Sequence, residues 1–420
     1  MNTVESKQRN LSLIKWLTYF MFMMFAMTTD SVGVIIPEVI KEFRLSMTVG
    51  GAFHYAAMLG IAVAGFFLGY LADKLGRKNS IILGLVLFAL NSYLFAVGHA
   101  FSFFIVLLFV SGAAIGIFKT GALALIGDIT GSTTEHTTTM NTVEGFFAIG
   151  AIIGPAIVAR LLSMGTSWKW LYVIAGTICV VLIVIASLVQ YPSTTTTAES
   201  VDLKRTLRMM KNPYALGFSG AIFLYVAVES AVYVWMPTLL GGYHGSFLWM
   251  ATYAISIFFI LRAAGRFLGS WLLSHLNWAA VVTLFSLAIL ACFIGSMAAG
   301  IRVAVFLLPI SGLFMSVLYP TINSKGISCF PKPEHGAVSG VILFFTCLSA
   351  VLAPFAMGAI SDSLGSPKYG FILATGFAGL LFFSLLLNWI LDPTREILNQ
   401  FDSTQYHSVD NDSLPASLRI

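Results

Sequence analysis

The chain has 420 residues, of which 58% are hydrophobic and 10% are charged, and its formal net charge is +5. A soluble globular domain has about 25% charged residues, so this composition excludes a soluble protein and predicts an integral membrane protein. The small positive balance is typical of membrane topology and gives no reason to expect a nucleic-acid partner.

Long apolar segments follow one another along the whole chain. A helix of about 20 residues spans the hydrocarbon core of a bilayer, so we predict an all-α fold with twelve transmembrane helices. The first segment is too long for a signal peptide, and we expect it to stay in the mature protein. The predicted spans are 13–38, 48–73, 79–98, 102–129, 138–163, 167–190, 214–239, 247–274, 278–299, 302–328, 336–361 and 368–391.

A polar interruption divides these spans into two sets of six. We predict an N-terminal bundle over 1–190, a cytoplasmic linker over 191–212, a C-terminal bundle over 213–391 and a polar, disordered cytoplasmic tail over 392–420. Within the linker, apolar residues at helical spacing favour a short interfacial helix. A solvated basic loop is the alternative there.

Landmarks recur at a shift of about 200 residues. Pro37 corresponds to Pro237, Gly69 to Gly269 and Pro155 to Pro354. This repetition predicts a duplicated six-helix unit, an arrangement that places the substrate site near the middle of the membrane, between the halves.

The basic residues indicate an orientation. Most of the 23 Lys and Arg residues fall on the side of the two termini. Basic residues gather on the cytoplasmic side, so we expect both termini in the cytoplasm and the protein in the cell (inner) membrane.

The first span carries a carboxylate, Asp30, about two helical turns before its predicted outer end. A shift of 200 residues places it at Ser230, next to the acid of the seventh span. We predict that Asp30 takes part in proton coupling. Structural pairing with a basic residue is the alternative.

The loop after the second span reads GYLADKLGRK and holds the sharpest local pattern. It resembles the signature loop of the major facilitator superfamily, whose role is conformational control. That resemblance implies gating roles for Gly69, Asp73, Gly76, Arg77 and Lys78, and not substrate binding.

Lys119 is a basic residue within the fourth span. A buried lysine needs a partner, and Glu144 on the next helix and Asp30 are the candidates. We also predict that Glu144 takes part in proton coupling, together with Asp30. The ion pair could be mobile during the transport cycle or a fixed strut. A third hypothesis makes Lys119 the contact for an anionic substrate.

Glu229 lies within the apolar sequence FLYVAVESAVYVWMP of the seventh span. A carboxylate in a span costs about 2.5 to 3.5 kcal/mol on insertion scales, so it normally faces an aqueous cavity or a partner. Burial disfavours its charged form, as a proton carrier requires. We predict proton coupling and substrate contact for Glu229, with a hydrogen bond to a neighbouring helix as the alternative.

Arg262 and Arg266 share one face of the eighth span at i and i+4. We predict that both act in gating, with helix packing as the alternative for Arg266. Arg262 lies deeper in the membrane and could neutralise Glu229.

Several stretches resemble the fucose permease branch of the superfamily, the fucose, galactose and glucose symporters. The matching stretches are NTVEGFFAIGAII from Asn141, YVAVE from Tyr225, GRFLGSWLLS from Gly265 and FMSVLYPTINSKGI from Phe314. The resemblance implies that Glu229 faces a central cavity. Sugar symporters of this branch carry an acid at the place of Lys119, so the chain departs from the family there.

Other polar and aromatic side chains are candidates for contact with substrate hydroxyl groups. Asn141, Asn323 and Tyr225 can donate or accept such hydrogen bonds, and Trp235 could stack on a sugar ring. Asn141 matches the family motif, whereas Asn323 replaces a more common apolar residue.

These observations predict a secondary active transporter that works by alternating access. We favour proton symport of a small hydrophilic solute, a sugar first of all, with sodium as the alternative ion. The alternatives are an exporter or antiporter, or a carrier of a small organic anion or metabolite. The expected partners are the solute, protons and the lipid bilayer, and we expect a monomer.

A membrane enzyme or a sensor is a different class of function. The seven histidines are scattered, the four cysteines have no metal-ligand spacing, and no nucleotide-binding motif is present. We therefore expect no enzyme activity, no metal, no cofactor and no drive by ATP.

Overall fold

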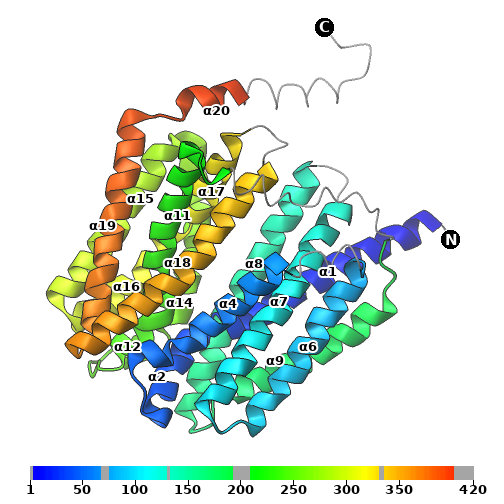
Figure 1. The fold of residues 1–420 in the computed structure, drawn as a ribbon, viewed down its shortest axis with the longest axis horizontal. Helices are drawn as coiled ribbons and strands as arrows, with labels where there is room; N and C mark the ends of the chain where they lie inside the picture. The colour runs from blue at the N-terminus through cyan, green and yellow to red at the C-terminus, as the bar shows by residue number, and fades with distance from the viewer. Residues whose placement is uncertain (1–2, 68–74, 130–132, 193–208, 331–334, 402–420) are drawn as a thin grey trace.

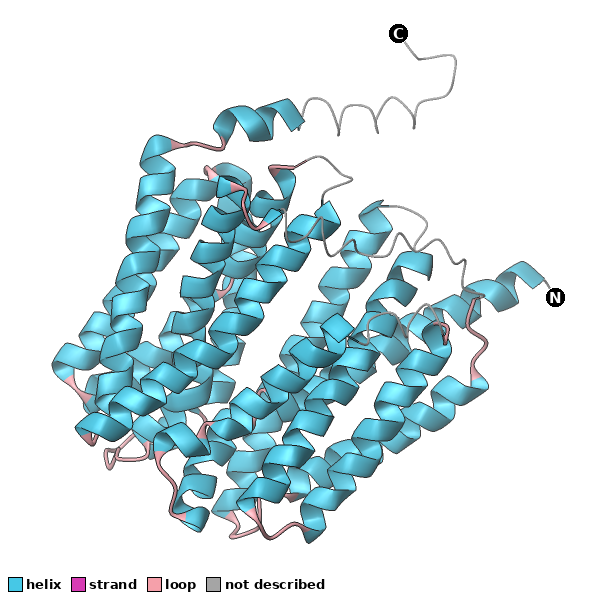
Figure 2. Ribbon diagram, viewed as in Figure 1, coloured by secondary structure: helices cyan, strands magenta, loops and turns pink. Residues whose placement is uncertain are grey.

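The structure is a computed structural model that describes residues 3–67, 75–129, 133–192, 209–330 and 335–401. Every regular element within these ranges is a helix (Figure 2). Twelve of the helical segments in this part of the chain are long and apolar enough to cross a membrane. The predicted all-α fold with twelve spans is confirmed, and the chain is a multi-pass membrane protein.

The helices gather in two bundles (Figure 1). Of the twelve spans, six lie between Asn10 and Leu188 and six between Pro213 and Leu391. The first, called the N half, contains α1 (Thr3–Thr29), α2 (Val32–Phe43), α3 (Met47–Gly50), α4 (Ala52–Phe67), α6 (Arg77–Val97), α7 (Phe101–Ile129), α8 (Thr133–Ser163) and α9 (Trp170–Leu188). The second, called the C half, contains α11 (Pro213–Ser230), the π-helix η1 (Ala231–Trp235), α12 (Met236–Leu240), α13 (Leu248–Thr252), α14 (Ala254–His275), α15 (Trp278–Ala299), α16 (Ile301–Met315), α17 (Leu318–Ser328), α18 (His335–Leu364) and α19 (Pro367–Leu391).

Two predicted segment ends differ from the structure. The eighth span was predicted from 247, but the short helix α13 and a break at Tyr253 come before α14. The tail was predicted to be disordered from 392, but α20 (Arg395–Phe401) follows, because Leu398 is buried against the C half. The predicted interfacial helix lies mostly outside the described residues.

Small residues allow neighbouring helices to approach closely within the N half. A Cβ added at Gly60 of α4 would lie 2.2 Å from the carbonyl oxygen of Phe109, and one added at Gly112 of α7 would lie 2.1 Å from that of Ala57. Lipid is as apolar as the side chains, so membrane helices associate through close packing of this kind.

Three spans are interrupted near their middle. The first breaks at Asp30 and Ser31, the seventh changes to π-helix after Ser230, and the tenth breaks at Ser316 and Val317. The first two breaks lie 200 residues apart, as the repeat predicts. Interrupted helices leave backbone groups free for other partners, which is typical of the central sites of transporters.

The two halves touch at the end of the bundle where α2 meets α12, here called the contact end. A Cβ added at Gly33 of α2 would lie 1.7 Å from the carbonyl oxygen of Tyr233 in η1. The opposite end carries α20 and is called the tail end (Figure 1). The halves are therefore closed against each other at the contact end in this conformation.

Candidate functional site

Glu229 forms an ion pair at the junction of α11 and η1. Its carboxylate Oε1 contacts the guanidinium Nη1 of Arg262 on α14, the next span of the C half. Only 8% of Glu229 is exposed. The pairing of Arg262 with Glu229, one of the possibilities considered from the sequence, is present in this structure.

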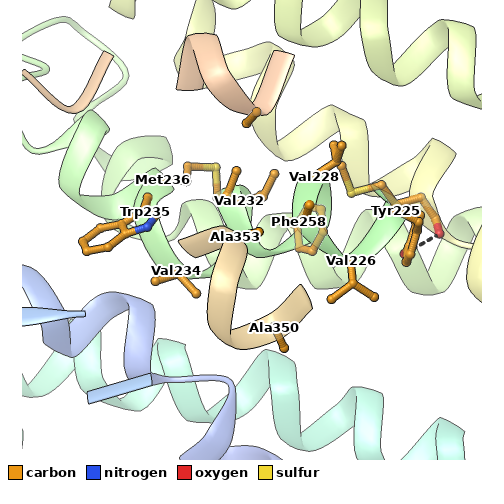
Figure 3. Close-up of a cluster of buried hydrophobic side chains, with 14 of the residues drawn as sticks. Tyr225, Val226, Val228, Val232, Val234, Trp235, Met236, Phe258, Ala350 and Ala353 are labelled. Carbon is orange, nitrogen blue, oxygen red and sulfur yellow. Dashed lines mark hydrogen bonds between the residues drawn. The ribbon is translucent and has the colours of Figure 1, made fainter. Parts of the chain in front are cut away.

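Tyr225 lies one helical turn before Glu229 and completes a polar group in an apolar setting. Its hydroxyl lies 3.1 Å from Glu229 Oε1 and 3.0 Å from the carbonyl oxygen of Met315, at the break between α16 and α17. A tyrosine hydroxyl has one hydrogen, so it donates mainly to one of these acceptors at a time. Figure 3 shows the apolar side chains around it, among them Val226, Val228 and Phe258.

Burial makes this group costly to disturb. Removing one partner from a buried ion pair leaves an uncompensated charge, which typically costs about 3 to 5 kcal/mol. Arg262 also has a buried Nε atom with no hydrogen-bond acceptor among the described residues. The guanidinium therefore has an unused donor beside the carboxylate.

A second pair of charges lies one turn further along α14. Arg266 Nη2 lies 4.0 Å from Oε2 of Glu144 on α8, and the two side chains are 36% and 54% exposed. This loose pair joins the two halves. Arg266 therefore pairs with the Glu144 carboxylate, which the sequence suggested as a partner of Lys119.

The predicted ion pair of Lys119 with Glu144 or Asp30 is absent from this conformation. The Lys119 ammonium lies 5.3 Å from the centre of the Phe147 ring on α8, and it forms no ion pair with any described residue. A cation over an aromatic face is attracted less strongly than one paired with a carboxylate. The half-buried Lys119 ammonium can therefore still bind an anion.

Asp30 lies at the break between α1 and α2. It accepts a hydrogen bond of 2.9 Å from the Thr29 hydroxyl. The charged groups that act on it are Arg262, Lys119 and Glu229. Asp30 and Glu229, two of the three acids predicted to couple protons, therefore both interact with the Arg262 guanidinium.

Trp235 does not offer a face for stacking in this conformation. It is 1% exposed and belongs to the buried cluster drawn in Figure 3. Its Nε1 donates a 3.0 Å hydrogen bond to the carbonyl oxygen of Pro354. Its ring meets the positions of Gly51 in the N half and Gly358 in the C half. The ring is enclosed because it fills the contact between the halves.

The two predicted asparagines differ in what the structure says about them. Asn323 is half-buried on α17, one turn after Tyr319, whose ring lies 6.2 Å from that of Tyr225. Asn141 belongs to α8, but its side chain lies outside the described residues.

The predicted gating loop is described only in its second part. Gly69 and Asp73 lie outside the described residues, Gly76 has φ +82° before α6, and Arg77 begins that helix. Lys78 donates to the carbonyl oxygens of Ser187 at 2.8 Å and Val189 at 2.9 Å. A lysine at the carboxyl end of a helix is favoured there, so Lys78 ties α6 to α9 within one half, and its gating role stays a prediction.

Two contacts between the halves were not predicted as functional. His54 of α4 has its Nε2 atom 3.1 Å from the carbonyl oxygen of Ala350 on α18. Asp362 at the end of α18 bonds to the start of α3. In the sequence, Ser361 with Asp362 after the eleventh span resembles the fucose permease branch, but that resemblance gave Asp362 no role.

The chain is similar to known proteins in sequence and in fold. The Major Facilitator Superfamily model matches residues 16–354. The L-fucose-proton symporter of Escherichia coli (strain K12) is 25% identical over 87% of this chain and 90% of its own length. The glucose/galactose transporter of Brucella abortus biovar 1 (strain 9-941) is 22% identical over 87% of this chain and 92% of its own. The crystal structure of the transporter FucP in the outward conformation has a TM-score of 0.63 and 21% identity, covering 90% of this chain and 99% of that one.

Proposed function

Because the chain belongs to the Major Facilitator Superfamily, we propose that it is a secondary transporter that couples uptake of a small sugar to protons. The names of the two curated relatives, a fucose-proton symporter and a glucose/galactose transporter, support this solute class. We place it in the inner membrane of the cell with both termini in the cytoplasm. The conformation described above then faces the cytoplasm, because the halves are closed at the contact end.

The observation that carries the proposal is the buried pair of Glu229 and Arg262, with Tyr225 beside it. A carboxylate inside a span is costly unless it is paired or has a function. Here the same carboxylate is paired, lies at a change of helix type and can exchange its partner for a proton. This combination suits a coupling residue better than a permanent strut.

In the proposed cycle, the proton and Arg262 compete for Glu229. When the outer side is open, a proton neutralises Glu229 and releases the Arg262 guanidinium, which then donates to hydroxyl groups of the sugar. When the inner side is open, Glu229 loses its proton and pairs again with Arg262, so the sugar loses its donor and leaves. The ion pair seen here corresponds to the state after release.

Asp30 supports the same cycle from the N half. The Asp30 carboxylate interacts with the charges of Arg262 and Glu229, so its charge affects how strongly the Arg262 guanidinium binds Glu229. We assign it a role in coupling across the boundary between the halves, and we propose that the loose pair of Glu144 and Arg266 tightens when the cytoplasmic side closes.

Uptake into proteoliposomes tests the proposal. Labelled L-fucose, galactose and glucose are offered to vesicles with an acidic exterior, with and without a proton uncoupler. We expect at least one sugar to accumulate above its outside concentration, and the uncoupler to abolish accumulation. Glu229→Gln should lose proton-driven accumulation, whereas Glu38→Gln, which changes an acid at the contact end, should keep it. Sugar uptake that ignores the proton gradient would refute coupling.

A second candidate function is the transport of a sugar acid or another small organic anion. The observation in its favour is Lys119, which has no carboxylate partner among the described residues. A charge-assisted hydrogen bond contributes about 1.5 to 3 kcal/mol. A substrate carboxylate bound to Lys119 would therefore gain affinity that a neutral sugar lacks.

Binding assays separate the two candidates. If the solute is an anion, Lys119→Gln should weaken its binding roughly 10- to 150-fold, the equivalent of 1.5 to 3 kcal/mol, and Lys119→Arg should retain most of it. Lys41→Gln, at the exposed end of α2, is the matched control. Binding of a neutral sugar that is unchanged in Lys119→Gln, with no binding of glucuronate or gluconate to the parent, would reject the anion.

A further inference from the structure

Asp362, two residues before the end of α18, reaches from the C half to the N half. Its carboxylate accepts hydrogen bonds from the backbone N–H groups of Met47 and Thr48, both at 2.7 Å. The hydroxyl of Thr48 donates to the same carboxylate. One side chain thus holds three donors across the boundary between the halves.

These bonds complete the hydrogen bonding at the start of the second span. The first N–H groups of a helix have no partner within it. Ser46 is the N-cap of α3, and its side chain accepts from Val49, while its carbonyl accepts from Gly50. The N–H groups of Met47 and Thr48 remain, and both donate to Asp362. The second span is therefore capped partly by its own half and partly by the other.

The position of Asp362 is unfavourable for its own helix. A negative charge near the carboxyl end of α18 meets the negative pole of that helix, whereas the start of α3 offers two free N–H donors. Bonds from N–H groups to a carboxylate are also stronger than neutral ones. The carboxylate is stabilised by the partner half and not by α18.

A glycine one turn earlier lets the two helices approach. A Cβ added at Gly358 would lie 3.1 Å from Cα and 3.2 Å from N of Thr48, and 3.2 Å from the ring of Trp235. A side chain here would require the neighbouring atoms to move by a few tenths of an ångström. The backbone of α18 is thus shaped to lie against the same residues that Asp362 binds.

We infer that Asp362, Met47 and Thr48 form a latch, here called the Asp362 latch, that holds the contact end closed and must open in each transport cycle. The inference rests on alternating access as proposed above, but not on the identity of the solute or on proton coupling. Asp362 is exposed to water, so its carboxylate and the N–H groups can be hydrated when the halves separate. The latch therefore stabilises one conformation without locking it.

Hydrogen exchange measured by mass spectrometry on the full chain in nanodiscs tests the latch. In Asp362→Asn, we expect amide exchange over 46–51 to accelerate roughly tenfold, which corresponds to 1.4 kcal/mol. Exchange should also accelerate in η1, which meets the N half at Gly33. The backbone amides of α8 and α14 at the tail end should exchange more slowly, because opening the contact end closes the tail end. Glu38→Gln, an acid removed from the same end of the N half, should match the parent.

Two further variants address the same contact by other means. Thr48→Val removes one donor and should change exchange in the same direction by less. Gly358→Ala adds a methyl group against Thr48 and should open the contact end even with Asp362 intact, so it also serves if Asp362→Asn fails to fold. The latch would be overturned if Asp362→Asn left exchange over 46–51 unchanged. It would also be overturned if exchange there became faster while exchange of α8 and α14 at the tail end did not slow. Solute uptake by the parent is measured in parallel. If the parent takes up no sugar while exchange changes as expected, the sugar proposal fails and the latch stands.

Discussion

Arg262→Met is expected to abolish solute uptake and to lower the free energy of unfolding by about 3 kcal/mol. The substitution leaves the Glu229 carboxylate buried without its cation, which typically costs about 3 to 5 kcal/mol. We expect the lower end of this range because the Arg262 side chain keeps 20% of its exposure and water can reach it. Thermal unfolding in detergent and uptake in proteoliposomes measure the two effects.

The double variant Arg262→Met with Glu229→Gln distinguishes stability from function. Removing both charges replaces a buried ion pair by neutral groups, which is often close to neutral for stability. The double variant should therefore recover most of the melting temperature and still fail to couple uptake to protons. Arg302→Met, at the exposed start of α16, should resemble the parent in both assays. Normal coupled uptake by the double variant would show that the pair is structural only.

Gly33→Ala is expected to stop transport by preventing closure of the contact end. The added Cβ would lie 1.7 Å from the carbonyl oxygen of Tyr233, which belongs to the backbone of η1 and cannot move aside by a change of rotamer. Overpacking typically costs about 1 to 3 kcal/mol. A cost of about 3 kcal/mol, borne only by the closed arrangement, would shift the equilibrium roughly 150-fold toward the outward-open state.

The matched control for this variant is Gly65→Ala in α4 of the same half. A Cβ added at Gly65 would meet no heavy atom of another helix within 4 Å. It should transport like the parent. Gly33→Ala should keep a normal melting temperature, because the clash lies between the halves and not within one. Uptake at the parental rate by Gly33→Ala would mean that tight closure of α2 against η1 is not a required step of the cycle.

The sequence was sufficient for properties that depend on local stretches. Twelve spans, two sets of six and the location of Glu229 within an apolar segment follow from hydropathy, because about 20 consecutive apolar residues are enough to require a membrane helix. The acids were recognised as unusual for the same reason, since a charge in such a segment is costly whatever its neighbours are.

The partners of those charges were decided only by the tertiary structure. Lys119 meets Phe147 instead of Glu144, because the side-chain direction and depth of α7 relative to α8 cannot be read from either segment alone. Trp235 is enclosed instead of open to a sugar, and Asp362 caps a helix more than 300 residues away in the chain. These contacts join the two halves, and they depend on how one bundle lies against the other. Hydropathy fixes which residues enter the membrane, whereas the relative placement of two separately built bundles fixes which of them touch.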